Sequence, residues 1–263
     1  MGYRVNAGLR PLFTLAALAA LFLGIGGAQA EENRDCEECP IMVTMPEGPD
    51  FGKFTVTRRE FEAFAKDTGL KEEKLCFRWR EQRPYRDDNA AWRKPGFEQG
   101  ADHPVVCVTW VEATAYADWL SEKTGKSYRL PTLEESQSAA AANADTRFWW
   151  GDNPDDICQY ANVGDRTFKA NFPSVERNFD CEDGFVFTAP VGSFKPNSYG
   201  LHDMNGNVWQ WTNSCLKGDC ANAIFRGAAW NDIWPKQVEL THSFGDRIQL
   251  RGASVGFRVV RDK

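Results

Sequence analysis

The chain has 263 residues, of which 42% are hydrophobic and 26% charged, and its formal net charge at pH 7 is −6. Nucleic-acid binding requires a basic face that neutralises phosphates, so this acidic balance excludes nucleic acid as a partner class. The length, together with the lack of internal repeats and low-complexity linkers, favours one mixed domain with enough chain to bury a core.

The amino-terminal residues have the pattern of a secretory signal peptide. Arg4 and Arg10 precede an apolar run over residues 12–25, and Ala28 and Ala30 form a small-residue cleavage site. An uncleaved membrane anchor is the alternative, but the apolar run is short for a span. We therefore predict a signal peptide over residues 1–30. The mature chain, residues 31–263, is expected to be periplasmic or secreted and to have no membrane span.

All of the cysteines follow the predicted cleavage site. They are Cys36, Cys39, Cys76, Cys107, Cys158, Cys181, Cys215 and Cys220. An even count in an exported chain indicates disulfides, but the sequence alone does not choose the pairs. Cys36 and Cys39 have the CxxC spacing of redox and zinc sites. Their acidic neighbours would raise a thiol pKa, and there is no second CxxC, so a structural disulfide is favoured over both.

Three helices are predicted from Ser/Thr-x-x-Glu capping boxes at Thr57, Thr109 and Thr132. The second helix has apolar residues at helical spacing and ends at Gly125. Beyond residue 145 the chain consists of short segments rich in Gly, Pro, Asn and Asp, with little periodicity. A long irregular stretch within one domain requires disulfides, metals or a functional reason for its order.

Six motifs along the chain carry a resemblance to a known family. They are residues 104–110 (PVVCVTW), 128–132 (YRLPT), 183–191 (DGF followed by TAPV), 199–212 (YGLHDMNGNVWQWT), 225–230 (FRGAAW) and 256–260 (GFRVV). With these motifs in the family's order, the chain resembles the formylglycine-generating enzymes, also called sulfatase-modifying factors, over roughly residues 36–261. The resemblance implies an α+β, C-type-lectin-like single domain, rich in irregular structure and stabilised by disulfides and calcium.

The resemblance also implies which cysteines pair. It favours disulfides between Cys76 and Cys107, between Cys158 and Cys181, and between Cys215 and Cys220, which leaves Cys36 for Cys39.

Two calcium sites are implied by the same resemblance. In the first, Asn162 and Asp183 match side-chain ligands, and Val163 and Phe185 match carbonyl donors. In the second, Asp203 and Gln210 match side-chain ligands, and Gly206 and Val208 match carbonyl donors. Gln210 stands where the family usually has Glu, which removes one charge from the second site. Oxygen donors of this kind suit calcium. The alternative is that these residues only form turns.

The chain departs from the family near its carboxyl end. Family members hold copper with a cysteine pair between the motifs that correspond here to residues 225–230 and 256–260. Residues 231–256 of this chain contain no cysteine. Because Cu(I) needs soft thiolate or thioether ligands, we expect calcium and not copper as the cofactor, and formylglycine generation by the family's copper mechanism is not supported.

His242, Glu239 and Arg251 are the catalytic candidates, because they lie in the tract where the family keeps its active site. The alternative is a solvated polar loop. The sequence favours the loop, since nothing in it shows that these groups converge.

Two functions remain open from the sequence. The first is an exported accessory or maturation factor that acts on a peptide-like or protein substrate in the periplasm, by analogy with family members of siderophore maturation. The second is a non-catalytic binding module that presents residues 231–251, including Trp234 and Phe244, to a protein or ligand partner. A structural subunit of an envelope complex is a third, weaker interpretation. The sequence does not name the partner, and we expect a monomer.

Overall fold

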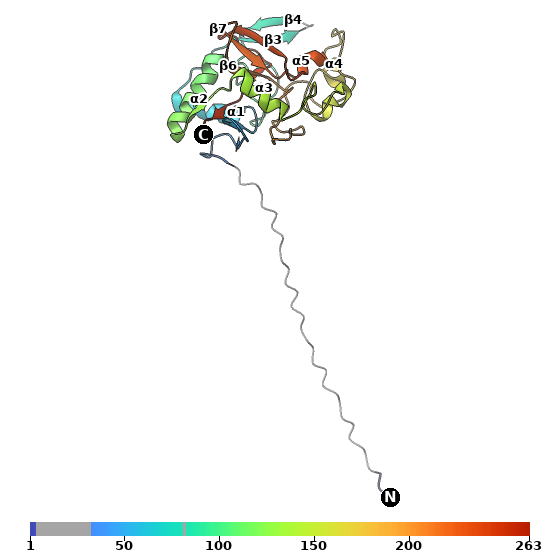
Figure 1. Ribbon diagram of the computed structural model, residues 1–263. Coiled ribbons are helices and arrows are strands. Elements are labelled where there is room, and N and C mark those ends of the chain that lie inside the picture. Colours follow the sequence, from blue (N-terminus) through green and yellow to red (C-terminus); the bar gives the residue numbers. More distant parts are fainter. Residues whose placement is uncertain (4–32, 81–82) are drawn as a thin grey trace. The chain divides into compact units, whose positions relative to one another are not determined.

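The computed structural model describes residues 1–3, 33–80 and 83–263, and the residues from 33 onward belong to one compact unit (Figure 1). The predicted signal peptide, except for its first three residues, lies outside the described residues. Within them, no helix is long and apolar enough to cross a membrane.

Capping boxes begin the three long helices, as predicted. These helices are α1 (Arg58–Thr68), α2 (Trp110–Thr124) and α3 (Leu133–Ala141). In each, the threonine before the helix accepts a hydrogen bond from the N–H of the glutamate three residues on, and the glutamate carboxylate accepts one from the threonine N–H. α1 and α2 end at Gly69 and Gly125, in the left-handed conformation that glycine adopts without strain.

The first two helices pack together through aromatic rings. Phe61 of α1, Tyr116 of α2 and Phe257 near the carboxyl end are fully buried, and their ring centroids lie 5.3–6.1 Å apart. Such edge-to-face and offset contacts add stabilisation beyond the apolar area that they bury. These three rings belong to the larger hydrophobic core of the described residues.

The strands form two four-stranded sheets and one separate hairpin. The first sheet is antiparallel, in the order β1 (Met42–Val43), β2 (Asp50–Gly52), β10 (Val260–Arg261) and β5 (Tyr128–Arg129). The second has the order β8 (Ser243–Arg247), β7 (Asp219–Arg226), β6 (Trp209–Leu216) and β9 (Val255–Phe257), with only β6 and β9 parallel. The hairpin joins β3 (Cys76–Arg80) to β4 (Arg83–Asp87). The mixed α+β fold is therefore confirmed.

The carboxyl-terminal half matches the expected texture only in part. Residues 172–208 contain no helix or strand, and the short elements before and after them are η1 (Pro154–Gln159), α4 (Arg166–Asn171) and α5 (Pro235–Val238). The long β6–β7 hairpin was not predicted from the sequence. The first four residues of β6 are all buried, so the strand has no alternation of polar and apolar residues.

The three disulfides that the resemblance implies are present, and so is the fourth pair that they leave over. They join Cys36 to Cys39, Cys76 to Cys107, Cys158 to Cys181, and Cys215 to Cys220. The described residues include every cysteine of the chain and contain no free one.

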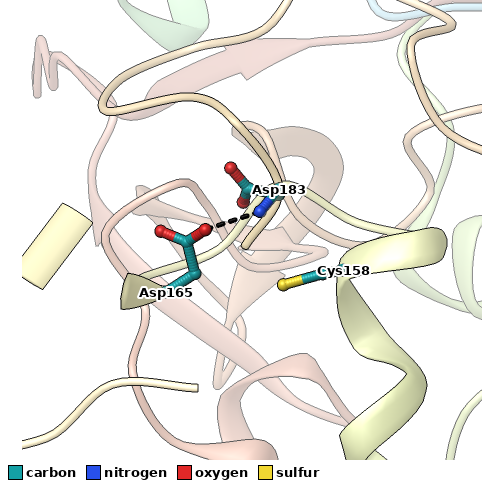
Figure 2. A group of neighbouring side chains, drawn as sticks. All are labelled: Cys158, Asp165 and Asp183. Carbon is teal, nitrogen blue, oxygen red and sulfur yellow. Dashed lines mark hydrogen bonds between the residues drawn. The ribbon is translucent and has the colours of Figure 1, made fainter. Parts of the chain in front are cut away.

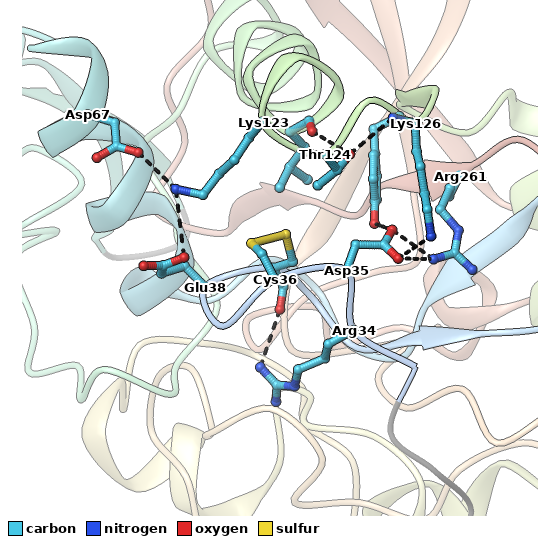
Figure 3. Close-up of a disulfide and its surroundings, with 12 residues drawn as sticks. Arg34, Asp35, Cys36, Glu38, Asp67, Lys123, Thr124, Lys126 and Arg261 are labelled. Atoms are coloured by element: carbon cyan, nitrogen blue, oxygen red, sulfur yellow. Dashed lines mark hydrogen bonds and ion pairs between the residues drawn. A yellow bond between two sulfur atoms is a disulfide. The ribbon is translucent and has the colours of Figure 1, made fainter.

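Ion pairs hold the Cys36–Cys39 loop against the rest of the unit (Figure 3). Lys123 of α2 lies between Glu38 (3.7 Å) and Asp67 (3.1 Å). Asp35 accepts hydrogen bonds from Lys126, Tyr128 and Arg261. Burial raises the pKa of Asp35, but these hydrogen bonds outweigh it and lower the pKa to about 2. Asp35 and Glu38, two of the acidic residues around the CxxC, are therefore paired with basic side chains.

Candidate functional site

The first implied calcium site is built around Asp183. One carboxylate oxygen accepts a hydrogen bond from the N–H of Val163 (2.9 Å) and the other from the N–H of Phe185 (2.8 Å). Asn162 is fully buried, and its Oδ1 has no hydrogen-bond partner. Because an unpaired buried oxygen is costly, it marks a position for a ligand. The carbonyl of Val163 accepts a hydrogen bond from the N–H of Asp165 (2.8 Å) but has a second lone pair for an ion. A carboxylate, an unpaired amide oxygen and such a carbonyl are donor types of calcium sites, so these residues fit the ion.

Asp165 lies beside this site and was missed by the sequence analysis (Figure 2). Its Oδ1 accepts from the N–H of Phe168 and caps α4, and its Oδ2 accepts from the N–H of Asp183 (2.6 Å). Burial raises the pKa of Asp183 to about 7, and the charge of Asp165 adds to this increase. The hydrogen bonds from the N–H groups of Phe185 and Val163 act in the opposite direction and lower the pKa. Cys158 is near both carboxylates but cannot act as a thiolate ligand, since it is in a disulfide. The only sequence signal for Asp165 was its place before a short helix.

The second implied calcium site has a different environment. Asp203 is buried, and its Oδ1 has no partner. However, the side-chain oxygen of Gln210 accepts from Nε of the buried Arg258 (3.0 Å), and its nitrogen donates to the carbonyl of Asp203 (2.8 Å). The carbonyl of Gly206 accepts from the N–H of Val208 (2.9 Å). The fixed guanidinium takes the amide oxygen and adds a positive charge, so this set does not fit calcium.

The three catalytic candidates do not form one cluster. His242 and Glu239 are neighbours, joined by a hydrogen bond from the N–H of His242 to the carbonyl of Glu239 (3.0 Å), and Glu239 pairs with Arg147 (2.7 Å). The His242 ring packs against Phe244, with centroids 4.8 Å apart, and burial lowers the pKa of His242.

Arg251 lies elsewhere, in an ion-pair cluster with Glu112 at the start of α2 and with Glu73. Within the described residues, no hydrogen bond or ion pair joins Arg251 to His242 or Glu239. These ion pairs favour a structural role for Arg251.

A cavity of about 600 Å³ opens between the β3–β4 hairpin, β8 and the segment 230–237. We call it the aromatic cleft, and its lining includes Trp79, Trp209, Phe225, Trp230, Trp234 and Phe244. Trp209 and Trp230 are almost fully buried, whereas Trp234 and Phe244 are 46% and 47% exposed. Large apolar side chains with a few polar groups are typical of small-molecule and peptide sites. Trp234 and Phe244 were predicted from the sequence to be presented to a partner, whereas Trp209 and Trp230 lie in the motifs of residues 199–212 and 225–230 and were not predicted to line a cleft.

Polar groups of the aromatic cleft come from the segment after Trp230. Asp232 is 6% exposed and accepts hydrogen bonds from the N–H of Ala229 (2.7 Å) and from Nε2 of Gln237 (2.6 Å). Burial raises the pKa of Asp232 to about 7, although hydrogen bonds from Ala229, Trp209 and Gln237 lower it. A carboxyl with a pKa near neutrality in a cleft is a candidate functional group.

The first calcium site and the aromatic cleft share backbone contacts. The N–H of Gly164 donates to the carbonyl of Asp232 (2.8 Å), and a Cβ at Gly164 would lie only 2.5 Å from a methyl of Ile233. The N–H of Asn207 donates to the carbonyl of Asn162 (2.8 Å). The carbonyl of Asn207 in turn accepts a hydrogen bond from the N–H of Trp230 (3.1 Å). An ion that orders Asn162 would therefore also order one wall of the cleft.

No cysteine lines the aromatic cleft, and the disulfides occupy every cysteine of the chain. The residues present therefore do not fit copper, because they provide no thiolate.

Comparison with known proteins places these features in one family. The family described as "Sulfatase-modifying factor enzyme 1-like domain" matches residues 21–263. The chain is 30% identical over 230 residues to a formylglycine-generating enzyme of Thermomonospora curvata, covering 78% of this chain and 66% of that protein. It is also 30% identical over 266 residues to the inactive C-alpha-formylglycine-generating enzyme 2 of Bos taurus, covering 88% of this chain and 83% of that protein.

A solved structure gives the same result. The structure of PvdO from Pseudomonas aeruginosa matches with a TM-score of 0.68 and 26% identity, covering 88% of this chain and 97% of that one. The match of nearly the whole chain, together with the fold and the four disulfides, shows that the protein belongs to the sulfatase-modifying factor family.

Proposed function

We propose that this protein is an exported accessory or maturation factor that acts on a peptide-like or protein substrate, in the periplasm or outside the cell, without the copper-cysteine centre of its family. The observation that carries the proposal is the aromatic cleft, which combines a volume of about 600 Å³ with a buried carboxyl and no thiol. A cleft of this size accommodates a side chain or small peptide.

Two further features support the proposal. Four disulfides are typical of an oxidising compartment, which agrees with the signal peptide predicted over residues 1–30. A relative of similar identity is named as an inactive formylglycine-generating enzyme. The fold thus occurs without formylglycine generation. Calcium at the first site is part of the proposal, with Asn162 and Asp183 as side-chain ligands, and it would stabilise the wall of the cleft.

A binding module is the second candidate function. It is favoured by the exposure of Trp234 and Phe244, which together offer an apolar surface at the cleft in the tract 231–251. In this case the cleft would hold a protein or ligand partner without changing it.

The experiment is a comparison of envelope metabolites and peptides, by mass spectrometry, between the source organism and a strain that lacks the protein. We expect a precursor to accumulate in the deletion strain and to be converted again when the wild-type chain is restored. The double variant Trp234→Ala/Phe244→Ala should fail to restore conversion. Val111→Ala, on an equally exposed residue of α2 outside the cleft, is the matched control and should restore it. Unchanged masses in all strains would favour the binding module.

We also expect no conversion of cysteine to formylglycine. The purified mature chain is incubated with copper, a thiol reductant, oxygen and a Cys-x-Pro-x-Arg peptide, and the aldehyde is sought by mass. The physical reason is that recruiting a thiolate pair would require opening a disulfide, which typically costs about 2–5 kcal/mol. Aldehyde formation that stops when copper is chelated would contradict the prediction.

A further inference from the structure

The aromatic cleft contains two buried acceptor groups with unused hydrogen-bonding capacity. Asn231 Oδ1 is buried and has no hydrogen-bond partner. The neighbouring carboxylate of Asp232 offers about four lone-pair positions, of which Ala229, Gln237 and Trp209 use three. A buried acceptor without a donor costs free energy. The cleft is therefore suited to a ligand that brings N–H or O–H groups.

The carboxyl of Asp232 also lacks a counter-charge. Within the described residues, no ion pair includes it. Charged and titratable groups on the elements packed around it are Arg78 of β3, Asp165 before α4, Lys236 and Glu239 near α5, His242 beside Trp209, and Asp246 and Arg247 of β8. Arg78 already pairs with Asp87 (2.8 Å), and Glu239 with Arg147. Lys236 and Arg247 form no ion pair with Asp232 within the described residues, so a positive charge that pairs with Asp232 in this arrangement comes from the ligand.

The walls of the cleft suit such a charge. Trp209 donates a hydrogen bond to Asp232 and lies 5.6 Å from Phe225 and 5.4 Å from Phe244, between ring centroids. Trp230 precedes the two acceptors directly in the chain and is 2% exposed. Ammonium groups are attracted to the faces of aromatic rings, most strongly to tryptophan, and the attraction grows when water is excluded.

We propose that the aromatic cleft binds the primary ammonium group of a peptide-like substrate, with Asp232 and Asn231 accepting its N–H donors. The inference rests on the proposed function, because it takes the cleft as the substrate site. Gln237 acts as a positioning residue. Its Nε2 donates to Asp232, while its Oε1 accepts from the N–H groups of Ile233 and Trp234.

The test uses two capped amino acids of matched shape, Nα-acetyl-lysine N-methylamide and Nα-acetyl-norleucine N-methylamide. Tryptophan fluorescence of the full mature chain reports their binding, since four tryptophans line the cleft. Burial raises the pKa of Asp232 to about 7, whereas a primary amine stays protonated to about pH 10. The affinity for the lysine compound should therefore rise about tenfold from about pH 6 to about pH 8, as Asp232 becomes ionised. The affinity for the norleucine compound should stay constant.

Asp232→Asn should abolish both the preference for lysine and its pH dependence. Asp102→Asn removes an exposed carboxylate outside the cleft and is the matched control, which should keep both. Equal affinity for the two compounds, or a pH-independent preference in the wild type, would overturn the inference, and the wild-type measurement stands even if Asp232→Asn does not fold. If lysine is not preferred while the cleft variants still fail to restore conversion in the deletion strain, the inference falls and the proposed function remains.

Discussion

Removal of calcium is expected to lower the melting temperature of the mature protein, and Asp183→Asn is expected to remove most of this effect. A ligand that binds only the native state stabilises it by RT ln(1 + [L]/Kd), which is about 2.7 kcal/mol at a hundredfold excess over Kd. The expectation follows from the unpaired Oδ1 of Asn162 and from the carboxyl of Asp183, whose pKa burial raises to about 7 without a cation. Thermal unfolding with and without a chelator measures the effect.

Asp203→Asn is the matched control for this experiment. Asp203 is buried, as a calcium ligand is expected to be. However, Arg258 donates a hydrogen bond to the side-chain oxygen of Gln210 and places a positive charge near Asp203. The variant should keep the chelator sensitivity of the wild type. A melting temperature that does not respond to the chelator in the wild-type protein, with no metal retained, would show that the chain has no calcium site.

Local features of the sequence predicted the elements whose causes are local. The three helix starts followed from a threonine and a glutamate three residues apart, and the ends of α1 and α2 from a glycine. The cysteine pairs followed from the family resemblance, since pairing depends on contacts between distant segments such as Cys76 and Cys107.

Less of the candidate site could be predicted from the sequence, because contacts between distant segments create it. Trp79, Trp209 and Trp230 come from three separate segments, and only the fold places them around one cavity. Asp232 was not among the predicted site residues. Its burial, which raises its pKa, depends on the packing of the segment around Gly164. Likewise, the hydrogen bond from Arg258 to the side-chain oxygen of Gln210 could not be predicted from the sequence, because the two residues are far apart in the chain.

Arg251→Met is expected to destabilise the fold by about 3–5 kcal/mol, because it leaves Glu112 as an unpaired buried charge. The side chains of Arg251 and Glu112 are 8% and 11% exposed, and Glu112 also caps α2. Urea unfolding measures the loss. Glu73→Gln is the matched control, since Glu73 pairs with the same arginine but is 74% exposed, and such surface pairs contribute about 0–1 kcal/mol.

The double variant Arg251→Met/Glu112→Gln distinguishes the effect of the unpaired charge from the effect of lost side-chain packing. It should recover part of the lost stability, because no unpaired buried charge remains, while a weakened cap on α2 keeps it below the wild type. A catalytic Arg251 would behave differently. Its replacement would leave urea unfolding unchanged and abolish conversion in the deletion-strain experiment. That outcome would return Arg251 to the active site and would mean that the ion pair with Glu112 contributes little to the fold.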